Sequence, residues 1–144
     1  MNAIELKKEF CESVFTPFNK EFMNHNTGLR YFTKRNPHFF KRIIDRNINP
    51  HFVKGMFTTF ITNFHQNIME ICYSDASKMN STNSVCIFVK SYDIAIVVIL
   101  FDDRRQDNCF SMMPLTILDG HTYQKCDYEV DIDHDTQIKP VVEK

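Results

Sequence analysis

The sequence of 144 residues is poor in several features that define common classes of protein. It has no tryptophan, and its three glycines, Gly28, Gly55 and Gly120, lie too far apart to form a glycine-rich phosphate-binding loop. Because such loops cradle the phosphates of nucleoside triphosphates, this absence argues against an enzyme of that class. The five cysteines form no CxxC or cysteine–histidine spacing, so the sequence predicts neither a zinc site nor a disulfide framework.

Long apolar segments are also lacking. The longest apolar run, Ile94–Phe101, is far too short to cross a bilayer, and the first ten residues lack the apolar core of a signal peptide. An odd number of scattered thiols fits a reducing compartment. We therefore expect a cytoplasmic protein that has no membrane partner and no cofactor. We interpret Asp131, Asp133 and His134 as the soluble face of an edge strand, so no metal site is expected.

The composition is that of a globular protein, with 43% apolar and 24% charged residues. A net charge of −1 conceals an uneven distribution. Seven Lys/Arg and one acid lie between Arg30 and Lys54, whereas six acids and two lysines lie between Asp127 and Lys144. One end of the molecule should be cationic and the other anionic. We expect a single domain over residues 1–144, with helices in about 3–66, a sheet in about 68–132 and a tail in 133–144.

Two Asn-Pro pairs mark predicted helix starts, because asparagine is a good N-cap and proline is favoured in the first helical turn. Apolar residues at steps of three and four follow each pair, as in Phe52, Met56, Phe60 and Phe64. Proline inside a helix removes a backbone hydrogen bond and bends the chain. The predicted helices run from Ala3 to about His25 with a kink at Pro17, from Pro37 to about Arg46, and from Pro50 to about Gln66.

The second half has the period and composition of strands, so we expect an α+β fold with N-terminal helices packed on a small antiparallel sheet of about four strands. The run Ile94–Phe101 is continuously apolar, which predicts a central strand covered on both faces. Pro114 predicts a sheet edge or a bulge, because it cannot donate to the ladder. The predicted strands are Ile68–Tyr73, Val85–Lys90, Ile94–Phe101 and Phe110–Leu118, with an edge strand around Tyr128–Ile132.

The most suggestive group of residues is His38, Arg42 and Arg46, whose spacing of four places them on one side of a helix. Imidazole moves protons near neutral pH, and guanidinium groups bind phosphate, so this pattern suits phosphodiester chemistry. Spacing alone favours the plainer interpretation, a solvated polar face. Glu9 is either a general base or the partner of a basic side chain.

One family resembles this chain. The segment Pro37–Arg46, followed by Ile48 and Phe52–Phe57, resembles the phage T4-type early-mRNA endoribonucleases (the RegB family) and, more distantly, is similar to RelE-type toxins. The resemblance implies a RelE-like fold over about residues 3–118. It places His38 on a functionally important histidine, Arg42 on the neighbouring arginine and Glu9 on an acid of the first helix.

The family's second key histidine corresponds to Thr58 here, so His51 or His65 would have to replace it, or the activity is lost. The resemblance implies a metal-independent, phage- or mobile-element-encoded endoribonuclease that leaves a 2′,3′-cyclic phosphate. His38, Arg42, Arg46 and Glu9 would be catalytic. The RNA-binding residues would be Lys34, Arg35, Lys41, Arg104 and Arg105. The alternatives are a non-catalytic phage protein that binds and inhibits a host or defence protein, and a toxin or antitoxin partner.

Overall fold

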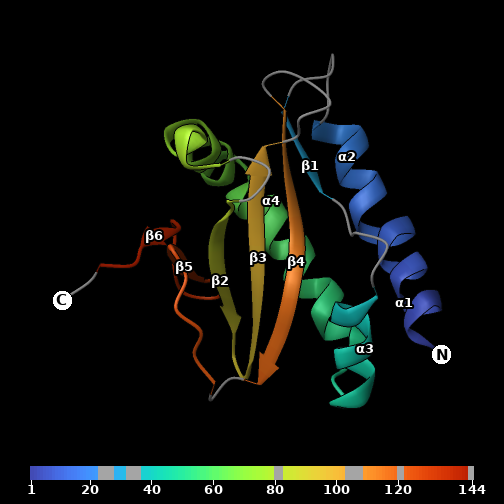
Figure 1. Ribbon diagram of the computed structural model, residues 1–144. Coiled ribbons are helices and arrows are strands. Elements are labelled where there is room, and N and C mark those ends of the chain that lie inside the picture. Colours follow the sequence, from blue (N-terminus) through green and yellow to red (C-terminus); the bar gives the residue numbers. More distant parts are fainter. Residues whose placement is uncertain (23–27, 32–36, 80–82, 103–108, 120–121, 143–144) are drawn as a thin grey trace.

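The computed structural model is a six-stranded mixed sheet with one long helix across a face and the shorter N-terminal helices beside one edge (Figure 1). It describes residues 1–22, 28–31, 37–79, 83–102, 109–119 and 122–142. The helical elements are α1 (Ala3–Phe10), a π-helical turn (Cys11–Phe15), α2 (Thr16–Phe22), α3 (His38–Asp45), α4 (Pro50–Ser74) and a 3-10 turn (Ala76–Lys78). The strands are β1 (Gly28–Tyr31), β2 (Val85–Ser91), β3 (Ile94–Asp102), β4 (Cys109–Asp119), β5 (Tyr128–Asp131) and β6 (Lys139–Pro140). The α+β class is confirmed.

The helical segment at the N-terminus starts where the side chain of Asn2 accepts a hydrogen bond of 2.9 Å from the backbone N–H of Glu5. The predicted irregularity at Pro17 takes the form of the π-helical turn that precedes it, in which the N–H of Thr16 reaches back to the carbonyl of Cys11. Proline has no N–H to donate, so the widened turn sits next to a position that cannot continue the regular ladder.

Helix α4 begins as predicted, because Asn49 caps it by accepting a 2.9 Å hydrogen bond from the N–H of His51. It does not end near Gln66. The helix extends for 25 residues to Ser74, so the strand predicted over Ile68–Tyr73 is wrong. Buried residues at Phe64, Ile68, Ile71 and Cys72 continue the spacing of three and four, which keeps one helix face against the sheet.

The strand order is β1-β4-β3-β2-β5-β6, so β3 is central as predicted. Its inward residues on both faces, such as Val97 and Val98, are fully buried. The β2–β3 hairpin and the β3–β4 pair are antiparallel, and the register slips near Val97/Val98 so that Leu115 is a bulge beside Pro114. The bulge that the sequence predicted therefore lies directly next to Pro114.

Two features of the sheet differ from the prediction. It has six strands rather than four, because β1 and β6 add short strands at its two sides. It is also mixed rather than antiparallel, since β1 runs parallel to β4 and β5 parallel to β2. The segment predicted as a tail contributes β6, and Ile138 is buried with its N–H 3.3 Å from the side-chain oxygen of Asn67.

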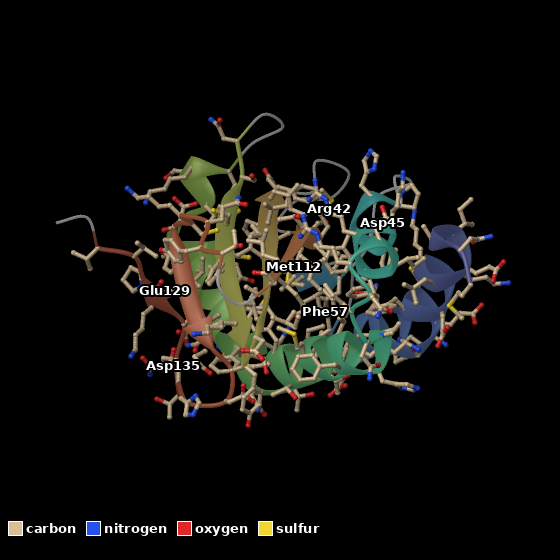
Figure 2. All side chains as sticks on the ribbon, turned by 90° about the horizontal axis from the view of Figure 1, so that it is seen from below. Arg42, Asp45, Phe57, Met112, Glu129 and Asp135 are labelled. Atoms are coloured by element: carbon tan, nitrogen blue, oxygen red, sulfur yellow. The ribbon has the colours of Figure 1, made fainter. Side chains whose placement is uncertain are left out.

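The main core fills the space between α4 and the sheet. Figure 2 shows Phe57 of α4 and Met112 of β4 in this layer, and both are buried. A smaller cluster covers the opposite face, where Phe88, Ala95 and Val97 pack with Cys126. The opposite face is therefore partly covered by the described residues 122–127 that precede β5. We call the face of the sheet that carries this smaller cluster the outer face.

Candidate functional site

Helix α3 and the residue that caps its C-terminus carry the predicted basic row, which consists of His38, Arg42 and Arg46. His38 is the first residue of the helix and is exposed, and Arg42 follows one turn later. Phe39, Phe40 and Ile43 turn inward and bury the opposite side of the helix. This amphipathic division orients the row, because the inward residues lock α3 against the core.

Both arginines of the row contact β4. Arg42 donates to the hydroxyl of Thr116, and Arg46 donates to the backbone carbonyl of Ile117. Figure 2 shows Arg42 between α3 and β4. Strand β1 pairs with β4 only from Cys109 to Met112, so in the described part of the chain the rest of β4 has no strand on this side. The two arginines therefore donate hydrogen bonds to acceptors on the part of β4 that no described strand covers.

The geometry separates Glu9 from this row. Its carboxylate forms an ion pair with Lys54 of α4, whose ammonium group lies 5.6 Å from the centre of the Phe10 ring. The Lys54 side chain is only 16% exposed, whereas that of Glu9 is 41% exposed. The pair links α1 to α4, which is the second of the two interpretations of Glu9 drawn from the sequence.

Thr58, which stands where the resemblance requires a second histidine, is exposed on α4. Its hydroxyl donates a 2.9 Å hydrogen bond to the backbone carbonyl of Lys54 one turn earlier. His51 is exposed in the first turn of the same helix. Lys41 is exposed on α3, while Lys34, Arg35, Arg104 and Arg105 lie outside the described residues.

His65 belongs to a different cluster, which sequence reasoning missed. Its Nδ1 atom lies 2.7 Å from the hydroxyl of Tyr31, and its ring stacks on Phe22 with centroids 3.6 Å apart. Burial lowers the pKa of His65 and raises the pKa of Tyr31 well above its usual value. A neutral imidazole and a protonated Tyr31 hydroxyl therefore share this hydrogen bond. The contact depends on β1, which was not predicted.

A second candidate site lies on the outer face, over β2 and β5. An open cavity of about 460 Å³ is bounded there by Phe88, Lys90, Thr122, Tyr123, Glu129, Val130, Asp131, Asp135 and Lys139. Phe88 is paired with Glu129 across the two strands, and Lys90 with Asp131, so these four side chains share one face. Tyr123 forms one wall, with its ring 5.0 Å from that of Phe88 in an edge-on arrangement.

The charged groups around this cavity are arranged in pairs. Asp135 accepts a 2.8 Å hydrogen bond from the N–H of Asp131 and lies 3.7 Å from the ammonium group of Lys139. Burial alone would raise the pKa of Asp131, but bonds from His134 and from the N–H of Asp133, with the charge of Lys90, bring it below its usual value. Figure 2 shows Glu129 and Asp135 on the β5 side of the molecule, away from Arg42. The two candidate sites are thus separate.

Asp131 was the available signal for this cavity, and its interpretation, with Asp133 and His134, as a soluble face overlooked the wall formed by Tyr123. Among the described residues, no three His, Cys, Asp or Glu side chains converge as the ligands of a metal ion would. None of the helices described here is long and apolar enough to cross a bilayer. Comparison with known families, with characterised proteins and with solved structures finds no match to this chain.

Proposed function

We propose that the protein is a metal-independent endoribonuclease whose site is the α3–β4 edge. The observation that carries this proposal is the anchoring of Arg42 and Arg46 by Thr116 and Ile117 beside the exposed His38. Each guanidinium group has five N–H donors, so one bond to β4 leaves donors for a phosphate. Anchoring also removes rotamer freedom before RNA binds, which favours the recognition of a fixed charge.

In the proposed reaction the 2′-hydroxyl of RNA attacks the adjacent phosphorus, and the bond from phosphorus to the 5′-oxygen breaks. His38 takes the proton of the 2′-hydroxyl, and water supplies a proton to the departing 5′-oxygen. Arg42 and Arg46 stabilise the charge that develops on the phosphate oxygens. The products are a 2′,3′-cyclic phosphate and a 5′-hydroxyl. Glu9 takes no direct part in this scheme, because Lys54 holds its carboxylate.

Affinity for RNA in this proposal comes mainly from charge. Lys41 extends the basic row on α3, and the sequence adds Lys34, Arg35, Arg104 and Arg105. Binding through phosphate contacts weakens as salt rises, because bound counterions are released on association. A RelE-like arrangement belongs to the same proposal and rests on the resemblance of residues 3–118.

The test is incubation of the purified protein with total RNA in EDTA, followed by mapping of the RNA ends. The proposal predicts fragments that end in 2′,3′-cyclic phosphate, with a yield that falls as salt is raised. Fragments with 3′-hydroxyl ends, or a requirement for divalent cations, would contradict it. Intact RNA across pools of different origin would also contradict it.

The outer-face cavity favours a second candidate function, a non-catalytic phage protein that binds and inhibits a host or defence protein. Its aromatic floor and wall, Phe88 and Tyr123, are surrounded by charges of both signs. Tyr123 is exposed and Phe88 is buried beneath it, and an exposed aromatic residue beside a charged rim is typical of contact surfaces between proteins. In affinity capture, Tyr123→Ala should lose a partner that His38→Ala retains. Loss through His38→Ala alone would contradict this second function.

A further inference from the structure

Two of the cysteines meet on the outer face of the sheet. Cys86 lies in β2, and Cys126 lies in the segment from β4 to β5 that covers this face. The backbone N–H of Asp127 donates to the carbonyl of Cys86 at 3.1 Å, and the N–H of Cys86 donates to the Asp127 carboxylate at 2.9 Å. These two bonds hold the chain beside Cys126 against β2. Cys86 also packs against the buried cluster that contains Cys126.

The strand register explains this proximity. Ile87 is paired with Tyr128, so Cys86 lies level with Asp127 and Cys126 is one residue further back. Neighbouring strands lie about 4.8 Å apart, and Cys126 directly precedes Asp127, which is hydrogen-bonded to Cys86. Disulfides join Cα atoms about 4.4–6.8 Å apart. The chain bends at Asp127, which brings the Cys126 side chain into the outer-face cluster with Cys86.

The two thiols differ in access to solvent. Cys126 is buried and Cys86 is partly exposed. Burial raises the pKa of Cys126, and the neighbouring Cys86 and Asp127 raise it further. Since the thiolate is the attacking species, Cys126 is a poor first nucleophile. Cys86 is the thiol that a dissolved oxidant reaches first, and Cys126 is placed to attack it afterwards.

We propose that Cys86 and Cys126 are a redox-active pair that forms a reversible disulfide with a low-molecular-weight disulfide, such as oxidised glutathione, as the oxidant. The Cys86 sulfur attacks the glutathione disulfide, its S–S bond breaks, and one glutathione leaves and takes up the proton. The Cys126 sulfur then attacks the Cys86 sulfur of the mixed disulfide, and the second glutathione leaves with the other proton. Two protein thiols are oxidised and one glutathione disulfide is reduced.

The disulfide has a structural consequence for the cavity described above. Tyr123, the wall of the cavity, is three residues before Cys126, and its ring contacts Phe88 of β2, two residues after Cys86. A covalent link between Cys86 and Cys126 therefore holds the segment that carries Tyr123 against the strand that carries Phe88. Occupancy of the cavity by any ligand or partner therefore becomes dependent on the redox state. This inference does not rest on the proposed ribonuclease activity.

The experiment uses the full chain in glutathione buffers of increasing oxidised fraction, followed by acid quenching, alkylation and peptide mass spectrometry. A Cys86–Cys126 linked peptide should form, and it should disappear on return to reduced glutathione. The melting temperature of the oxidised protein should rise by roughly 5–10 °C, because the bond restricts the unfolded chain. Cys11→Ser should change neither result and serves as the matched control.

Two outcomes would overturn the proposal. One is alkylation of both Cys86 and Cys126 at oxidant levels that modify another cysteine. The other is a link from either residue to Cys11, Cys72 or Cys109 in its place. The variant Cys86→Ser should abolish the link and leave Cys126 unmodified by glutathione. Because the wild-type chain supplies the main readout, the test stands even where a variant folds poorly.

Discussion

Arg46, at the end of α3, donates a hydrogen bond to the backbone carbonyl of Ile117 in β4, seventy-one residues later in the chain. Arg42 donates a second hydrogen bond to the hydroxyl of Thr116, so helix α3 covers the open edge of β4. Structural anchoring and the proposed phosphate binding are compatible, because an arginine donates several hydrogen bonds at once. Each role nevertheless predicts a separate measurable effect, since one concerns stability and the other activity.

The anchoring predicts that Arg46→Ala destabilises the fold by about 1–2 kcal/mol, because a charged donor is lost and the Ile117 carbonyl loses its partner. Urea unfolding measures this change. Lys41→Ala, at an exposed position on the same helix, is the matched control and should stay within about 0.5 kcal/mol of the wild type. Equal stability of the two variants would show that the contact between Arg46 and β4 contributes nothing.

The contact between Tyr31 and His65 predicts a dependence of stability on pH. The pKa of His65 is lowered on folding, so below about pH 6.5 the unfolded chain binds a proton that the folded chain does not. Stability is therefore full above this pH and falls as the pH drops through it towards the lowered value. Melting temperatures between about pH 5 and 8 should show this fall in the wild type and a smaller one in His65→Gln. The exposed His51→Gln should keep the wild-type slope, and an unchanged slope in His65→Gln would contradict the assignment.

The ion pair of Glu9 and Lys54 predicts a coupling free energy of about 0.5–1 kcal/mol in a double-mutant cycle, because Glu9 is partly solvated. The pair Lys8–Glu12 on the same segment, 4.0 Å apart with side chains 77% and 67% exposed, is the control and should show almost none. Glu9→Gln should also leave RNA cleavage within about twofold of the wild type. A cleavage rate about a hundredfold lower in Glu9→Gln would instead show that Glu9 takes part in catalysis.

Local signals in the sequence predicted much of the fold. Asn49-Pro50 marked the start of α4, the apolar run from Ile94 marked the central strand, and Pro114 marked the bulge. The end of α4 was missed because no glycine or proline stops it, and Ile68–Tyr73 is as apolar as a buried strand. The four-residue β1 and two-residue β6 are too short to carry a period, and parallel pairing is set by long-range packing.

The candidate site was predictable only in part. Spacing placed His38, Arg42 and Arg46 on one side of a helix. The β4 acceptors of the two arginines are more than seventy residues away, and no local pattern specifies them. The same holds for the partner of Glu9 on α4. The outer-face cavity is bounded by residues from several separate segments, which only the folded chain brings together.

The most direct test of the central proposal compares the RNA cleavage rates of His38→Ala and His51→Ala in EDTA. Both histidines are exposed in the first turn of a helix, so neither change should alter the melting temperature appreciably. The proposed mechanism predicts that His38→Ala loses at least about a hundredfold in rate while His51→Ala cleaves like the wild type. Equal cleavage by both variants would remove His38 from the reaction and, with it, the assignment of the α3–β4 edge as the active site.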